Sequence, residues 1–177
     1  MATKKNEQIV EIKPLEIEAV EIRITSITPL IVHSWSEKAK REMLDKQTGT
    51  TVVKKKAPKN PIEDFINSMY WISGKPTEYT LEAYEEAIAN GAKFGFPVTG
   101  IKQSAISGAF RGGMTKDKAS IRGAFFIDGI QVKGDLLAVI ESEPPVMRED
   151  MVRVGMGVAD IRYRGEFNNW SINLKLT

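Results

Sequence analysis

The chain has 177 residues, of which 25 are Lys or Arg and 23 are Asp or Glu, so its formal net charge is +2. It has no Cys and one His, His33, which excludes disulfides, thiolate metal centres, Cys nucleophiles and any site that needs two histidines. Apolar residues make up 42% of the sequence, enough for one core, so we expect a single domain over 1–177. Without an apolar run of membrane length or a signal-peptide pattern, we expect a cytoplasmic protein with no membrane partner.

The first third of the chain predicts a strand, a helix and a basic loop. Alternating Ile and Val residues predict a strand over 17–27. The side chains expected to be buried there are Val20, Ile22 and Ile24. Ser36 then begins a helix that extends to about residue 47, with Met43 and Leu44 as apolar positions. The stretch 48–60 has no apolar period and is dense in Lys and turn formers, so we expect a long, flexible, exposed loop.

Three further helices are expected in the middle of the chain. Pro61 begins the first, which we expect to continue through Tyr70 and end at Ser73. A short amphipathic helix occupies 80–90. The third is capped by Thr99 and has an apolar face of Ile101, Ala105, Ile106, Ala109 and Phe110 before it stops at Arg111.

The remainder of the chain predicts strands. Asp128-Gly129, between apolar stretches, is a hairpin signal. Residues 136–141 form a second strand, and 170–176 alternate between apolar and polar side chains as a half-buried strand does. Strands that close by hairpins and mix with helices predict an α+β fold with a largely antiparallel sheet.

Charge is distributed unevenly along the chain. Acidic residues dominate 7–21 and 78–86, whereas bases dominate 38–59 and 102–122. The small net charge of +2 is therefore the sum of acidic segments and basic segments. Solvated surface is the ordinary explanation for any one such segment, but two basic segments in Gly-, Ser- and Thr-rich connections favour a polyanion partner.

The two basic segments hold the candidate nucleic-acid contacts. Lysines of the 48–60 loop can pair with phosphates without reading sequence, and a helix start followed by Gly112-Gly113 can offer backbone amides to an anion. The predicted nucleic-acid-binding residues are Lys54, Lys55, Lys56, Lys59, Lys102, Gln103, Arg111, Lys116, Lys118 and Arg122. A solubilising loop and a solvated helix end are the alternatives. There is no Walker loop, so nucleotide hydrolysis is unsupported.

The segment 147–167 holds four Arg, matched by four acidic residues. Arg beside aromatic residues suits a single strand, but the neutral balance favours a salt-bridge network, either internal or between subunits. The residues predicted to form an oligomer contact are Arg148, Arg153, Asp160, Arg162 and Arg164. Asp160, Arg162 and Arg164 alternate and therefore share one face of a strand.

His33 is the one candidate for acid–base catalysis near neutral pH. A lone His between Val32 and Trp35 is more often a packed or capping residue. The carboxylate pairs Glu63-Asp64 and Glu149-Asp150 are adjacent in sequence rather than convergent. We therefore expect no catalytic residue, no metal site and no cofactor, and a protein that is not an enzyme.

Three stretches carry a family resemblance. They are 27–33 (ITPLIVH), 96–111 (FPVTGIKQSAISGAFR) and 124–129 (AFFIDG). Their order resembles the repeat-associated (RAMP-type) RNA-binding superfamily, to which CRISPR backbone and processing subunits belong. The family's pattern before its helix is matched loosely by Pro97, Gly100, Lys102, Gly108 and Arg111. The run 147–167 is similar to small phage and prophage proteins of the same design.

The resemblance implies a ferredoxin-like, RRM-like core and, for a phage protein, the host cytoplasm. In the superfamily's processing endonucleases a His near the first helix assists 2′-hydroxyl attack on RNA, and His33 lies in a comparable region. Members typically end with a further helix and a Gly-rich loop. This sequence stops at Thr177, so we expect either a shorter chain or a missing C-terminal tail.

These observations predict sequence-tolerant binding of single-stranded DNA or RNA by a homo-oligomeric phage or prophage protein. Replication, recombination and strand protection are the processes that need such binding. Two alternatives stay open. One is an RNA endonuclease that uses His33, and the other is a protein-interaction module that mimics a CRISPR backbone subunit.

Overall fold

The computed structural model describes residues 16–35, 37–49, 58–153, 155 and 157–177, excluding the side chains of 37–39. Lys54, Lys55 and Lys56 of the predicted basic loop lie outside the described residues. The strands are β1 (Val20–Thr25), β2 (Leu30–Val32), β3 (Tyr70–Ser73), β4 (Lys93–Pro97), β5 (Ile130–Val132), β6 (Asp135–Ile140), β7 (Val146–Arg153), β8 (Ala159–Phe167) and β9 (Ser171–Leu176). The helices are α1 (Glu37–Gln47), α2 (Pro61–Ser68), α3 (Leu81–Ala89), α4 (Val98–Arg111) and α5 (Lys118–Ala124).

Every paired strand is antiparallel, which confirms the predicted α+β class. The sheets have the strand orders β1-β9, β2-β8-β7 and β3-β4-β6-β5. Isolated bridges join Glu141 to Ser171 and Ile127 to Leu176, so β9 also touches the four-stranded sheet. None of the described helices is long and apolar enough to cross a membrane.

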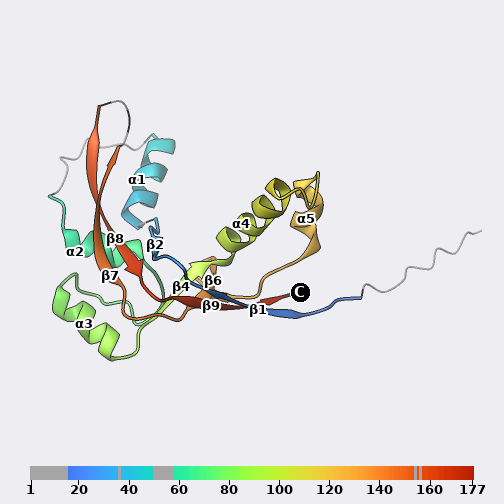
Figure 1. Cartoon of the computed structure of the whole chain (residues 1–177). Coiled ribbons are helices and arrows are strands. Elements are labelled where there is room, and N and C mark those ends of the chain that lie inside the picture. Colours follow the sequence, from blue (N-terminus) through green and yellow to red (C-terminus); the bar gives the residue numbers. More distant parts are fainter. Residues whose placement is uncertain (1–15, 36, 50–57, 154, 156) are drawn as a thin grey trace, which may run out of the picture.

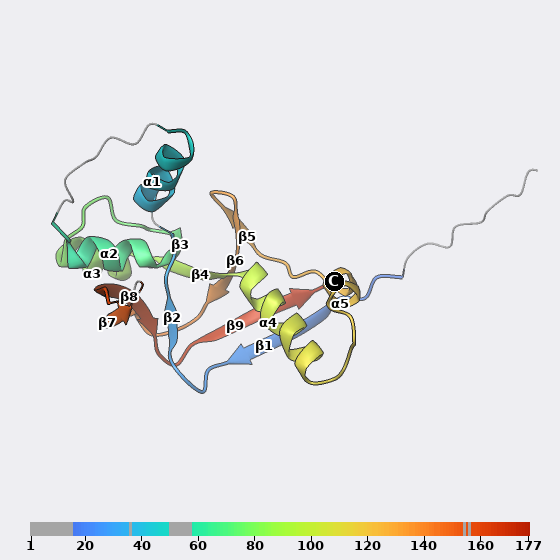
Figure 2. The ribbon, with the colours of Figure 1, turned by 90° about the horizontal axis from the view of Figure 1, so that it is seen from above.

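The molecule is elongated, with helices at both ends (Figures 1 and 2). One end holds α1, α2 and α3 around the β7–β8 hairpin. The other end holds α4 and α5, next to the β1–β9 pair and the C-terminus. The two predicted kinds of site, the basic helix end and the Arg-rich hairpin, therefore lie at opposite ends of the molecule.

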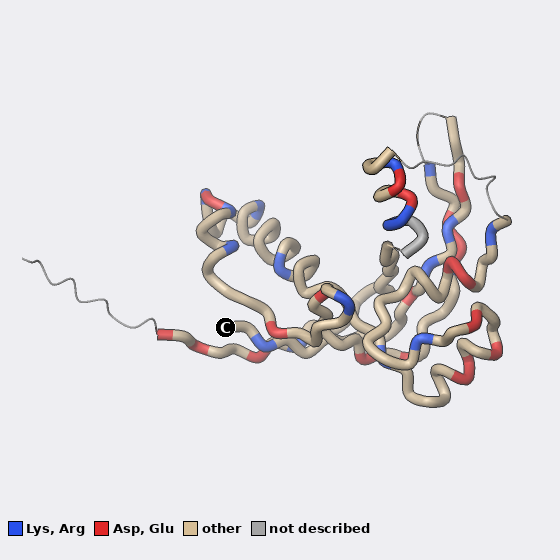
Figure 3. The backbone as a smooth tube through the Cα atoms, turned by 180° about the vertical axis from the view of Figure 1, so that it is seen from behind, with Lys and Arg blue, Asp and Glu red and all other residues tan. Residues whose placement is uncertain are grey.

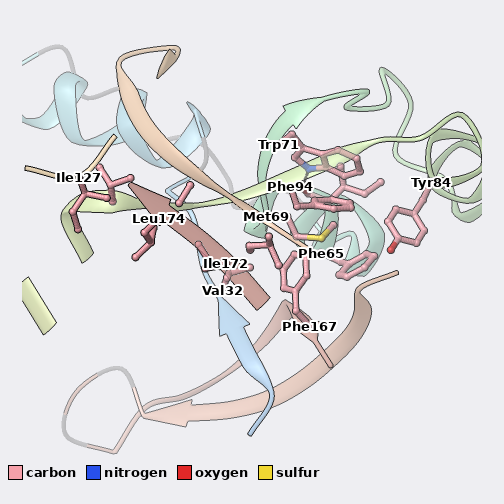
Figure 4. Close-up of a cluster of buried hydrophobic side chains, with 14 residues drawn as sticks. Val32, Phe65, Met69, Trp71, Tyr84, Phe94, Ile127, Phe167, Ile172 and Leu174 are labelled. Carbon is pink, nitrogen blue, oxygen red and sulfur yellow. Dashed lines mark hydrogen bonds between the residues drawn. The ribbon is translucent and has the colours of Figure 1, made fainter. Parts of the chain in front are cut away.

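An aromatic core joins these parts (Figure 4). The Phe94 ring packs 4.6 Å from the Trp71 ring and 5.4 Å from the Phe167 ring, measured between centroids. Tyr84 of α3 packs against Phe65 of α2 at 5.1 Å. Edge and tilted ring contacts of this kind stabilise beyond the apolar area that they bury. The core thus connects β3, β4 and β8 with two helices.

Helix α2 lies directly on β8. The buried Ser68 hydroxyl donates to the Phe65 carbonyl and accepts from the Gly165 backbone N–H at 2.8 Å. A Cβ at Gly165 would stand 2.5 Å from Met69, so only glycine permits this close approach. The approach fixes α2 against the strand that carries the alternating charges.

Several predicted elements are confirmed. Helix α1 ends at Gln47, and α3 ends at Ala89 with Asn90 as its C-cap. In β9 the predicted alternation holds from Ile172 to Lys175, because Ile172 and Leu174 are buried while Asn173 and Lys175 are exposed. Ser171, predicted on the polar face, is buried and donates to Glu141. Strand β6 also forms in the predicted place.

The burial predicted for the first strand is wrong. Val20 and Ile22 are exposed, and only Ile24 packs against the core. The physical reason is that β1 pairs with β9 alone, so its far edge and much of its surface remain uncovered. In α1 the predicted apolar positions Met43 and Leu44 are exposed as well.

Two predicted boundaries are also wrong. Helix α2 ends at Ser68, because Trp71 of β3 turns into the core and pairs with Phe94 of β4. Helix α4 begins at Val98 without a side-chain cap, so Thr99 is not its N-cap.

The predicted hairpin turn is misplaced. It forms at Lys133-Gly134, between β5 and β6, rather than at Asp128-Gly129. Both turn residues have positive φ, 48° and 95°, as a tight two-residue hairpin requires. Gly129 is instead packed closely against the Leu137 carbonyl.

Candidate nucleic-acid interface

The predicted basic segment 102–122 forms the α4–α5 helical hairpin. The two helices meet through two lysines whose ammonium groups lie over aromatic rings. Lys102 stands 4.5 Å from the Phe126 ring centroid and 5.3 Å from that of Phe125, and Lys118 stands 4.7 Å from that of Phe110. Cation–π attraction over these distances holds α5 against α4. It also fixes two positive charges beside aromatic surface.

The predicted anion site at the start of α4 does not involve Lys102 and Gln103. Because the helix begins at Val98, these residues lie in its second turn, beyond the first-turn amides. Val98 itself is buried in the core, so the helix start is turned toward the protein interior. Lys102 contributes through its charge and its ring contacts instead.

Positive charge nonetheless gathers on α4–α5. Figure 3 shows Lys and Arg positions along both helices. The bases of this hairpin are Lys102, Arg111, Lys116, Lys118 and Arg122. Asp117 is the only acid between Val98 and Phe126, and it caps α5 by accepting from the Ala119 and Ser120 amides. The Ser120 hydroxyl, followed by these amides, lowers the pKa of Asp117, so its charge is already satisfied locally.

Aromatic and sulfur side chains are exposed on the same hairpin. Phe126 is 63% exposed and Phe110 is 41% exposed. Met114, in the connection between the helices, is also largely in solvent. We define the α4–α5 surface as the five bases named above together with Phe110 and Phe126. A surface that offers both cations and ring faces matches the two components of a single strand, phosphate and base.

Lys59 lies elsewhere, at the opposite end of the molecule. Its ammonium donates to the Asp160 carboxylate and to the Ile161 carbonyl of β8, each at 2.5 Å. It is therefore tied to the protein and is not part of the α4–α5 surface. Among the described members of the predicted set, Lys59 is thus separated from the residues on α4 and α5.

The Arg-rich segment forms the β7–β8 hairpin, and its charges are largely paired within the chain. Asp160, Arg162 and Arg164 share one strand face, as predicted. The ion pairs are Arg148 with Asp150 and Glu166, Arg164 with Asp150, and Arg162 with Asp160, at 2.8 to 3.5 Å. Arg153 is exposed at the last residue of β7. The internal network, one of the two alternatives, is present, and the oligomer contact stays a prediction.

His33 lies just beyond β2, beside the charged face of β8. Arg162 Nη1 is 3.3 Å from His33 Nε2. A guanidinium only donates, so Nε2 accepts and the ring proton resides on Nδ1. Partial burial lowers the pKa of His33 below 6.5, Arg164 and Arg162 lower it further, and Asp64 opposes them. The imidazole is therefore neutral at pH 7.

We expect the single imidazole to titrate below 6.5 in an NMR experiment that follows its C2 proton. In Arg162→Gln the midpoint moves up toward 6.5, because a positive charge beside the ring is removed. Lys93→Gln, which removes a charge elsewhere, leaves the midpoint unchanged. An unshifted wild-type midpoint would contradict the Arg162–His33 contact.

The chemistry available around His33 is limited. A neutral imidazole can act as a general base, but its Nε2 lone pair is occupied by Arg162. Among the described residues no group of three His, Asp or Glu side chains converges as a metal site would require. Catalysis by His33 therefore receives no additional support from the geometry.

Two features of the interface were not anticipated. Helix α5 was not predicted, although Asp117 followed three residues later by Ser120 is a recognisable capping pattern. Phe125-Phe126 was expected only as part of an apolar stretch beside the hairpin signal, and its contact with Lys102 joins residues more than twenty positions apart in the sequence. The first feature has a local signal, and the second has none.

No protein-family model, no curated protein and no solved structure matches this chain. The resemblance to the RAMP-type superfamily therefore remains a prediction based on the short motifs quoted above. Function has to be argued from the geometry of the chain itself.

Proposed function

We propose that this protein binds single-stranded nucleic acid along the α4–α5 surface without reading its sequence. The observation that carries the proposal is the pairing of charge with exposed rings. The α4–α5 hairpin holds five bases and a single acid, which caps a helix. Phe110 and Phe126 are exposed next to Lys118 and Lys102. Phosphates would pair with the bases, and unstacked nucleobases would lie on the phenylalanine rings.

The geometry favours a single strand over a duplex. In a duplex the base faces are stacked on one another, so Phe110 and Phe126 would find only sugar and phosphate. The side chains of the α4–α5 surface are also too few to read base edges: Lys and Phe make generic contacts. Sequence tolerance follows from this composition.

We propose that protomers assemble along the strand. The β7–β8 hairpin supports this because apolar side chains remain exposed near its tip, among them Met151, which is 81% exposed, and its cross-strand partner Ile161. Of the arginines first expected to join neighbours, Arg148, Arg162 and Arg164 form ion pairs within the chain. The apolar pair of Met151 and Ile161 would therefore supply the contact, beside the exposed Arg153. A ferredoxin-like core, as the RAMP resemblance implies, is part of the same proposal. The antiparallel β4–β6 pair with α4 following β4 is compatible with it.

Fluorescence anisotropy with labelled 20-nucleotide single strands, of DNA and of RNA, tests the proposed function. Each phosphate contact on a single strand contributes about −0.7 to the slope of log K against log salt. Five contacts therefore predict a loss of about 100-fold in affinity between 50 and 200 mM salt. A duplex of the same sequence is the control and binds more weakly. Absence of binding at 50 mM salt, or binding indifferent to salt, would refute the proposal.

The endonuclease alternative is tested in the same samples. Incubation with RNA and with the matching DNA, followed by gel analysis, shows whether either strand is cut. Cleavage of RNA alone that disappears in His33→Ala would establish the alternative. Intact RNA with salt-sensitive binding supports the proposal as stated.

A further inference from the structure

A groove opens at the end of the molecule opposite the α4–α5 surface. Strand β2 stops at Val32, so the edge of β8 beyond Gly165 has no strand partner on that side. Helices α1 and α2 flank this open edge and leave a cavity of about 510 Å³. A volume of this size is in the range that accommodates a small organic ligand.

The groove has an aromatic wall. Trp35, in the connection between β2 and α1, is 58% exposed and lines the cavity. Met43 of α1 and Tyr163 of β8 line it as well. Ser34 holds this connection in place, because its amide donates to the Ser68 carbonyl and its hydroxyl to the Asn67 carbonyl. The large, flat indole is thus left in solvent on a fixed backbone, which is the usual arrangement of a stacking partner.

Polar groups line the rest of the cavity. Arg162 lies between the Asp160 carboxylate, 3.0 Å away, and His33 Nε2, 3.3 Å away. The His33 ring therefore carries its proton on Nδ1 and has one donor available to a ligand. Asp64 and Asn67, from α2, also line the groove. Cationic donors suit a phosphate, whereas a carboxylate and an amide suit the donors and acceptors on a base edge.

We propose that this groove binds one nucleotide unit, with its base against Trp35 and its phosphate at Arg162 and His33. Asp64 and Asn67 would contact the edge of the base. The inference does not depend on the α4–α5 surface, which lies at the other end of the molecule. A free nucleotide and one unit of a longer strand share this chemistry.

A peptide is the less favoured occupant. An extended peptide would pair with the open edge of β8, but the Lys59 ammonium already occupies the Ile161 carbonyl on that edge. Mixed charge around one exposed indole also matches the alternation of phosphate and aromatic base better than it matches an apolar side chain.

Isothermal calorimetry with the full chain tests the proposal. The ligands are a nucleoside 5′-monophosphate, the same nucleoside, and inorganic phosphate. The nucleotide is expected to bind at least about tenfold more tightly than either fragment, because the groove contacts both parts. Equal affinity for nucleotide and phosphate would overturn the proposal, since it would leave Trp35 without a role.

Trp35→Ala is the principal variant. Its exposed side chain makes it a mild change for the fold, and loss of base stacking should weaken nucleotide binding by about tenfold. Arg162→Gln should weaken it similarly. Lys93→Gln removes an exposed charge that belongs neither to the groove nor to the α4–α5 surface, so it is the matched control and leaves nucleotide binding unchanged. Nucleotide binding that Trp35→Ala does not alter would overturn the proposal.

The C2 proton of His33 supplies a readout that a merely structural role would not move. A bound phosphate stabilises the imidazolium, so saturating nucleotide should raise the titration midpoint of His33, whereas the nucleoside alone should not. The charged groups around the ring, Arg162, Arg164 and Asp64, are the same in both samples. An unchanged midpoint with bound nucleotide would contradict phosphate placement at His33.

A 5′-phosphorylated trinucleotide distinguishes the two sources of the ligand. If it binds more tightly than the mononucleotide and loses that affinity in Trp35→Ala, the groove receives one unit of a strand. If the mononucleotide binds equally well, the ligand is a free nucleotide. If neither the affinity for the trinucleotide nor that for the mononucleotide depends on Trp35, the groove is not a nucleotide site. Strand binding by the α4–α5 surface is measured separately, with Arg111 and Arg122 replaced, so failure of nucleotide binding in the groove is distinguishable from failure of strand binding.

Discussion

Replacing both Arg111 and Arg122 with Gln will weaken single-strand binding by about 25-fold at 0.1 M salt. Each lost phosphate contact removes about 0.7 from the salt slope, and at 0.1 M salt this equals about fivefold in affinity. Both arginines are exposed on the α4–α5 surface, so their removal leaves the core intact. Anisotropy titrations at several salt concentrations measure both the affinity and the slope.

A double variant with the same change in charge is the control. Arg41→Gln with Lys93→Gln removes two exposed positive charges, in α1 and in β4, away from the α4–α5 surface. If net charge alone determined the affinity for the single strand, the two double variants would bind it equally well. We expect the control to retain the wild-type salt slope. An equal loss in both would show that the strand responds to overall charge, and the α4–α5 surface would no longer be the interface.

Phe167→Ala will lower the free energy of unfolding by about 3–5 kcal/mol. Phe167 is 0% exposed and its ring packs against Phe94, so truncation leaves a cavity where β8 meets β4. This loss is a large fraction of the stability of an ordinary domain. Urea denaturation followed by circular dichroism gives the shift in midpoint.

Phe126→Ala is the matched comparison, because the same side chain is removed from an exposed position. Its cost is expected to stay within about 1 kcal/mol, which includes the cation–π contact with Lys102. Phe126→Ala should also weaken strand binding in the folded protein, whereas Phe167→Ala weakens it only by unfolding the protein. Similar destabilisation by both would contradict the placement of Phe167 at the centre of the core.

Local sequence patterns predicted correctly those features that depend on a single element. The alternation in β9, the short helix α3 and the charge matching in β7–β8 are all visible without knowledge of neighbours. The candidate bases on α4–α5 were also found in this way, because a run of Lys and Arg with one acid is a property of the segment itself.

The ring partners of those bases could not be found in this way. Phe126 resembles a core residue in sequence, and its exposure next to Lys102 follows from how the chain after α5 passes α4. Likewise, the sequence around Trp35 does not predict a groove, because the other residues that line the groove come from α1, α2 and β8. Sites assembled from distant segments have no local signature.

The sequence by itself determined the α+β class, the absence of cysteine chemistry and the segments where charge gathers, since composition and short-range periodicity set these. Only the tertiary structure decided which apolar residues are covered. Val20 and Ile22 alternate as buried residues do, yet β1 has one partner strand and leaves them in solvent. The net charge of the chain is only +2, but tertiary packing places the basic α4–α5 surface at one end of the molecule and the internally paired charges of the β7–β8 hairpin at the other. Pairing across strands depends on register, which a linear count of charges does not contain.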